Sequence, residues 1–269
     1  MIKRFLLTPT LLLCLLFSSP AWAAFGFIGA AGAASSITSG TTLAITTSAA
    51  VENTNFGVVI IALDNTCTVD AETSEVSSIS DGANTYVKLK EFCNTQAGVA
   101  ADGATISTWY FKPASTLATS STVTITFANT ITAKVARLWE FSIGASKIPA
   151  IATGGGATLA ATQAENPGSI TLSSLASKEY LFLRSIANES NANCCTITTN
   201  YTALTASTAN TGAVATSQRV WGEFRILTAT GDTSNPTNVG NTDFASTYLA
   251  LEEVAAGVTR RPIQAIFLN

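Results

Sequence analysis

The sequence predicts an all-β protein, an antiparallel β-sandwich of the jelly-roll-like kind whose two related halves have an approximate two-fold or tandem arrangement. Short runs in which apolar and polar residues alternate recur along the chain, and turns rich in Gly, Asn and Asp separate them. No stretch beyond the N-terminal leader keeps a helical apolar period. Strands with one apolar face bury that face by packing one sheet against another.

The first residues are typical of an export signal. Lys3 and Arg4 precede an apolar run over 5–17, and residues 21–23 (Ala-Trp-Ala) place small side chains where a signal peptidase cuts. We therefore expect a signal peptide over 1–23 and a secreted or cell-surface mature chain. The run is shorter than the roughly 20 apolar residues of a membrane-spanning helix, so a membrane anchor is the weaker alternative. No membrane span is expected in the mature chain.

The composition argues against several classes of function. Charged residues make up only 12% of the chain and its net charge is −3, so it lacks the basic surplus that nucleic acids and anionic membranes attract. Histidine is absent, which removes Ser-His-Asp and Cys-His nucleophile pairs and histidine-based metal sites. We expect no nucleic-acid partner and no enzyme activity. Glycoside hydrolysis by two carboxylates is the one chemical alternative.

Four cysteines remain after export, and an even number in an exported chain predicts disulfides. Cys67 and Cys93 each follow an expected strand. If 76–80 is a strand that runs back between them, both cysteines lie at the same end of the sheet, which favours a Cys67–Cys93 bond. Cys194 and Cys195 could then close a ring between adjacent residues, stay reduced, or bridge to another chain.

Individual strands and turns can be placed along the chain. The run over 57–63 (GVVIIAL) is apolar on both faces, which predicts a central strand covered on both sides. Residues 121–127 (STVTITF) alternate strictly, which predicts a half-buried strand. Residues 81–84 (Asp-Gly-Ala-Asn) form a turn between two β-rich runs.

The second half of the chain repeats the pattern of the first in the same order, which predicts an internal duplication. Four pairs of segments correspond: 41–65 with 168–190, 84–86 with 199–202, 104–112 with 218–226, and 133–141 with 245–254. The expected organisation is a signal peptide (1–23), an apolar Gly/Ala-rich segment (24–40), a first half (41–145), a connection (146–165), a second half (166–257) and a strand-like tail (258–269).

Several short motifs connect this chain to a known kind of module: 60–65 (IIALDN), 77–86 (SSISDGANTY), Trp109 with Tyr110, 121–127, and 139–141 (WEF). In these motifs the chain resembles a widespread secreted two-repeat β-sandwich module of bacterial and phage-associated surface proteins. The likeness covers most of the mature chain, including its doubled layout. Because such modules are mostly of unknown function, the resemblance implies a fold, and binding or assembly at a surface, but no catalytic site.

Aromatic side chains are the first candidates for ligand binding. Trp109 and Tyr110 lie in one expected strand and Trp221 in its counterpart. Exposed aromatic rings would stack on the sugar rings of a surface glycan, whereas buried rings would pack the core between the sheets. Both alternatives stay open at the level of sequence.

Acidic side chains after the first central strand are candidate ligands for calcium. Asp64, Asp70 and Glu72 are close in sequence, and oxygen-rich loops at the end of a sandwich can hold Ca²⁺. Their order lacks the EF-hand pattern, so a solvated loop is the alternative. We expect no other cofactor.

The apolar termini are candidates for self-association. Residues 24–34 and 263–268 could each form an ordinary edge strand or pair with a neighbouring subunit. The leader, the Ser/Thr-rich surface, the cysteines and these termini together predict a non-catalytic structural or cell-surface protein that is adhesin-like or self-assembling. A carbohydrate-binding module is the alternative, and a glycoside hydrolase is disfavoured.

Overall fold

A computed structural model describes residues 25–64, 67, 69–95, 103–161, 167–189, 195–210, 217–238 and 244–257, and every element in these ranges is a β-strand. The strands are β1 (Gly26–Ser36), β2 (Gly40–Thr47), β3 (Asn55–Asp64), β4 (Val76–Ser80), β5 (Tyr86–Asn94), β6 (Ala104–Phe111), β7 (Thr122–Ile131), β8 (Lys134–Ser142), β9 (Lys147–Ala161), β10 (Ile170–Leu172), β11 (Lys178–Asn188), β12 (Cys195–Thr196), β13 (Thr202–Ala209), β14 (Gln218–Ala229), β15 (Asp232–Ser234), β16 (Thr237–Asn238) and β17 (Phe244–Ala255). The predicted signal peptide and the tail over 258–269 lie outside the described residues. In the described part, no helix could span a membrane.

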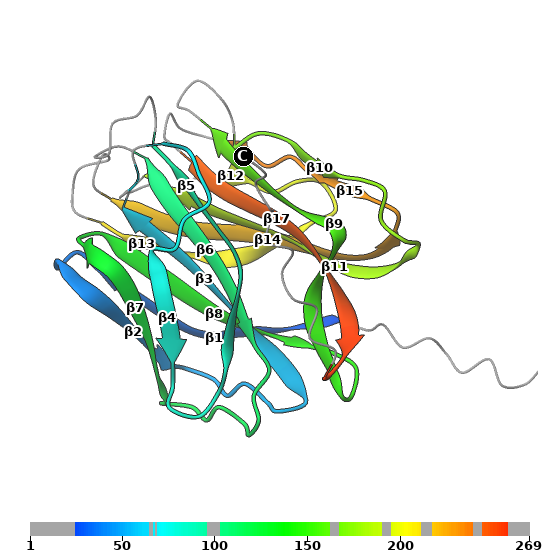
Figure 1. The fold of residues 1–269 in the computed structure, drawn as a ribbon, viewed down its shortest axis with the longest axis horizontal. Coiled ribbons are helices and arrows are strands. Elements are labelled where there is room, and N and C mark those ends of the chain that lie inside the picture. The colour runs from blue at the N-terminus through cyan, green and yellow to red at the C-terminus, as the bar shows by residue number, and fades with distance from the viewer. Residues whose placement is uncertain are drawn as a thin grey trace, which may run out of the picture.

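Eight strands form one antiparallel sheet in the order β4-β7-β2-β1-β8-β3-β6-β5. The sheet curls until its end strands β4 and β5 touch, so it resembles a nearly closed barrel, at the lower left of Figure 1. Its interior is apolar, and Val123, Ile125 and Phe127 of β7 all point into it. This confirms the half-buried strand predicted over 121–127.

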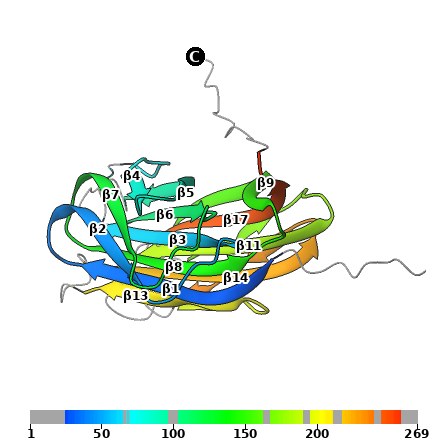
Figure 2. The same cartoon turned by 90° about the horizontal axis from the view of Figure 1, so that it is seen from below.

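A second antiparallel sheet has five strands in the order β13-β14-β11-β17-β9. It packs against the outer surface of the first sheet, with β1 and β13 at one edge and β5 and β9 at the other (Figure 2). Phe56, Ile60 and Trp139 of the first sheet meet Leu183 and Leu249 of the second in one shared core. Because β3 has the barrel interior on one side and this core on the other, it is covered on both faces, as the sequence predicts.

Two small sheets, β10-β15 and β12-β16, complete the described structure. Ile170 and Leu172 of β10 pack on Tyr180 and Phe182, which lie on the face of the five-stranded sheet turned away from the barrel. Both faces of that sheet are therefore covered, and its second face is the one on which polar side chains gather.

Two segments take a different place from the one expected. The stretch 24–40 contains β1, which pairs with β8 on one side and with β2 on the other, so β1 is an interior strand of its sheet. The stretch 146–165 contains strand β9, which pairs with β17, where a connection was expected. Gly154 has a φ of +74°, and a Cβ on Gly155 would lie 3.0 Å from the carbonyl oxygen of Ala250. These glycines permit a bulge in a strand, and they resemble a linker only by composition.

The predicted disulfide between Cys67 and Cys93 is present. The backbone N–H and C=O of Ala71 pair with those of Cys93, so the bond fastens this loop along the edge strand β5. Cys195 is also disulfide-bonded, which removes the reduced state from its three alternatives, while Cys194 lies outside the described residues.

Candidate functional site

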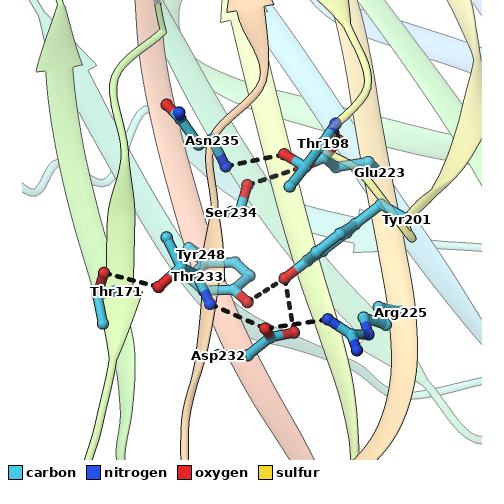
Figure 3. Close-up of polar contacts among 10 residues, drawn as sticks. All are labelled: Thr171, Thr198, Tyr201, Glu223, Arg225, Asp232, Thr233, Ser234, Asn235 and Tyr248. Atoms are coloured by element: carbon cyan, nitrogen blue, oxygen red, sulfur yellow. Dashed lines mark hydrogen bonds and ion pairs between the residues drawn. The ribbon is translucent and has the colours of Figure 1, made fainter.

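A polar network lies on the outer face of the five-stranded sheet, beneath the two small sheets (Figure 3). It starts from three neighbours in register: Arg184 of β11 pairs with Glu223 of β14 on one side and with Tyr248 of β17 on the other. Directly paired residues of antiparallel strands point to the same face. The ladder therefore brings a guanidinium, a carboxylate and a phenol together in one row.

Glu223 connects this row to the chain that covers it. Its side chain is fully buried, and its carboxylate accepts hydrogen bonds from the backbone N–H of Thr198 (2.7 Å), the hydroxyl of Thr198 (2.6 Å) and the hydroxyl of Ser234 (2.7 Å). Thr198 lies between β12 and β13, and Ser234 ends β15. One carboxylate thus holds two covering segments to the sheet.

Arg184 is the largest buried cation of the network. Its Nη2 donates to the carbonyl oxygens of Pro167 (2.8 Å) and Gly168 (3.3 Å) and to the hydroxyl of Ser246 (2.9 Å). Burial lowers the pKa of Arg184 to about 10, against the opposing charge of Glu223, so the guanidinium stays charged at neutral pH. Nε and Nη1 have no partner among the described residues.

A second group of contacts lies beside this row. The hydroxyl of Tyr201 donates to Oδ2 of Asp232 (2.8 Å) and also meets the hydroxyl of Tyr248. Nη1 of Arg225 lies 3.3 Å from Oδ1 of Asp232. Each charged group is thus already engaged by a neighbour from another strand. The network therefore stabilises the packing of the small sheets on the larger one, and it presents no open pair of carboxylates to a substrate.

The ionisation of the tyrosine side chains depends on their burial. Burial raises the pKa of all five tyrosines of the chain above the ordinary value of 10.0. In the unfolded chain the same phenols lose their protons once the pH passes that value. Their contribution to stability is therefore fully present below pH 10 and is lost as the pH rises further.

We predict that a spectrophotometric titration of the native protein shows little tyrosinate absorbance near pH 10. The absorbance should then rise together with the loss of β-sheet circular dichroism, because the buried phenols ionise only on unfolding. A denatured sample, in which the tyrosines titrate at their ordinary pKa, is the control. Tyrosinate absorbance that appears near pH 10 while the fold persists would contradict the burial of these rings.

The aromatic candidates are all buried, with exposed fractions of 6% for Trp109, 9% for Tyr110 and 6% for Trp221. Nε1 of Trp109 donates to the hydroxyl of Ser107 (2.8 Å) inside the barrel, and Trp221 packs against Ile186 of β11. In this arrangement the rings take the packing alternative. They offer no exposed face on which a sugar could stack, and the structure does not bring Trp109 and Trp221 into one cluster.

The acidic candidates do not form one site. Oδ1 of Asp70 accepts a hydrogen bond from the backbone N–H of Thr95 (2.8 Å), and the exposed Glu72 pairs with Lys90. Asp64 ends β3. Among the residues that the structure describes, no three metal-ligating side chains come together. Calcium binding by Asp64, Asp70 and Glu72 stays a prediction.

Sequence reasoning missed Arg184, Glu223 and Tyr201. One signal was available: Arg184 interrupts the apolar run over 181–187 (LFLRSIA), where a charge is costly unless it is compensated inside the fold. Its partners could not be named, because the pairing of β11 with β14 and β17 joins residues far apart in the chain.

The chain is an all-β protein with an eight-stranded, nearly closed antiparallel sheet and a five-stranded antiparallel sheet. It matches no protein-family model, no curated protein and no solved structure.

Proposed function

We propose that the mature chain is an exported, non-catalytic structural or cell-surface protein: a duplicated β-sandwich subunit that is adhesin-like or self-assembling. The observation that carries this proposal is the use of its buried carboxylates. The oxygens of Glu91 accept from the backbone N–H groups of Glu75 and Val76 and from the hydroxyl of Ser107. Glu140 accepts from the backbone N–H of Glu52 and the side-chain amide of Asn55.

Like Glu223, these carboxylates accept hydrogen bonds from other segments of the chain. A carboxylate that accepts hydrogen bonds from backbone N–H groups elsewhere in the chain stabilises loops and covering strands. A catalytic carboxylate, in contrast, must reach a substrate. The absence of histidine from the sequence agrees with this use.

The strand order supports the proposed duplication. The first sheet contains the order β8-β3-β6-β5 and the second the order β17-β11-β14-β13. These strands carry the four pairs of segments whose sequence patterns correspond. The facing strands are also reciprocal, since β1 lies on β13, β5 lies on β9, and β3 lies on β11. An approximate two-fold axis near the β3–β11 contact would produce this arrangement.

The disulfide between Cys67 and Cys93 supports the proposed export. Such bonds persist in oxidising compartments outside the cytosol, which is where a signal peptide over 1–23 would send the chain. The likeness to secreted two-repeat surface modules is supported as far as an all-β protein with two antiparallel sheets.

Self-assembly can be tested through the tail. Because β1 is an interior strand, deleting residues 24–34 would damage the fold, so 262–269 is the informative deletion. We expect the mature chain to form multimers in light scattering and electron microscopy, and the chain without 262–269 to be a monomer with unchanged circular dichroism. Monomers in both preparations would contradict self-assembly. Release of reducing sugar from polysaccharides would contradict the non-catalytic role.

A further inference from the structure

The two halves differ at one corner. In the first half, β1 pairs with β2 through Gly32 with Thr47 and Ala33 with Thr46, so its sheet continues around the barrel. In the second half, β9 and β10 occupy the corresponding places, but no pairing joins them in the described residues. In the described residues the second half therefore lacks the strand pairing that continues the sheet in the first half, although β9 and β10 still lie against each other.

A depression of about 340 Å³ lies between β9 and the segment that follows β10. Its lining comes from the bulge of β9, from the segment between β10 and β11, and from the ends of β11 and β17, and includes Thr153, Ser174, Ala176, Lys178 and Glu252. Its volume is at the small end of the usual range for ligand sites, roughly 300–1,000 Å³.

Two charged side chains that line the depression form an ion pair. Glu252 is only 3% exposed, and its carboxylate pairs with the ammonium of Lys178. That ammonium also lies 5.7 Å from the centre of the ring of Tyr180, which lines the depression too. The two charges offset each other, and the ammonium is the more accessible of the two, because the side chain of Lys178 is 46% exposed and that of Glu252 is 4% exposed.

The remaining polar lining is hydroxylic. Thr153 and Ser174 are both exposed at the rim. The depression thus offers a carboxylate that accepts hydrogen bonds, an ammonium that donates them and two hydroxyls that can do either. This set matches the alternating donors and acceptors of a sugar's ring hydroxyls. An apolar strand such as 263–268 of a second copy would leave these groups unpaired, which is costly.

We propose that this depression binds one or two residues of a neutral glycan, with Glu252 and Lys178 as the central hydrogen-bonding pair. The inference rests on the proposed non-catalytic surface role, and it places glycan binding away from the buried tryptophans. Binding uses residues of the second half only, because the corresponding corner of the first half is closed by the pairing of β1 with β2.

The test is a glycan array probed with the full mature chain, followed by calorimetric titration of the best neutral ligand. Glu252→Gln removes the charged acceptor and is expected to weaken binding by about tenfold or more. Thr153→Val, at the exposed rim, should weaken binding without affecting the fold. The matched control is Glu253→Gln: its carboxylate accepts from the backbone N–H of Gly144 outside the depression, so binding should be unchanged.

Each outcome distinguishes the two proposals. Binding of neutral glycans that Glu252→Gln and Thr153→Val both weaken supports the site. Absence of any neutral ligand, binding of acidic glycans only, or full affinity in the folded Thr153→Val and Glu252→Gln variants overturns it and leaves the surface role standing. Cleavage of a bound glycan overturns the non-catalytic role and leaves the binding site standing.

Discussion

Replacing Glu223 by leucine is expected to lower the free energy of unfolding by about 3–5 kcal/mol. The substitution removes the acceptor for the N–H and hydroxyl of Thr198 and for the hydroxyl of Ser234. It also leaves the guanidinium of Arg184 buried without its opposing charge. A buried charge that loses its partner keeps its desolvation penalty, which is why the expected loss exceeds that of a simple cavity.

A double variant separates the charge from the hydrogen bonds. Glu223→Leu combined with Arg184→Met removes both charges and fills their volume, so it should recover a large part of the stability that Glu223→Leu loses. Urea unfolding at neutral pH, followed by circular dichroism, gives the comparison. A loss below about 1 kcal/mol in Glu223→Leu would show that the network does little for folding.

Removing the disulfide between Cys67 and Cys93 is expected to cost about 3–4 kcal/mol, the chain-entropy value for a loop of 26 residues. The bond also fastens the loop that covers β5, which is held as well by the backbone pair of Ala71, the contact of Asp70 with Thr95 and the ion pair of Glu72 with Lys90. Since β5 is an edge strand, an uncovered β5 offers free backbone groups to another chain.

The measurement compares the mature protein with the variant that carries Cys67→Ala and Cys93→Ala. Substitution is preferable to a reducing agent, because Cys195 is also disulfide-bonded and would be reduced as well. We expect a lower urea midpoint and increased association in light scattering. Equal midpoints for the two proteins would mean that the loop is held by its hydrogen bonds and its ion pair alone.

Local patterns account for what was predicted correctly. The alternation over 121–127 and the apolar run over 57–63 each identify a strand and its covered faces, because side chains of a strand alternate within the segment itself. The bond between Cys67 and Cys93 followed from strand ends that share one side of a sheet. These features need no knowledge of distant residues.

Other patterns in the sequence fit two environments equally well. The three glycines of 154–156 suit a linker and a bulged strand equally well, and only the pairing of β9 with β17 distinguishes them. Trp109 and Trp221 alternate correctly for a strand, but alternation does not tell a face turned to solvent from a face turned to a second layer.

The sequence by itself predicted the all-β class and several of the strands, and it favoured the bond between Cys67 and Cys93. The tertiary structure decided the curling of the eight-stranded sheet, the interior place of β1 and the meeting of Arg184 with Glu223. Strand formation depends on a two-residue period that can be read locally. Strand order and register depend on contacts between segments far apart in the chain, and only the folded structure brings these segments together.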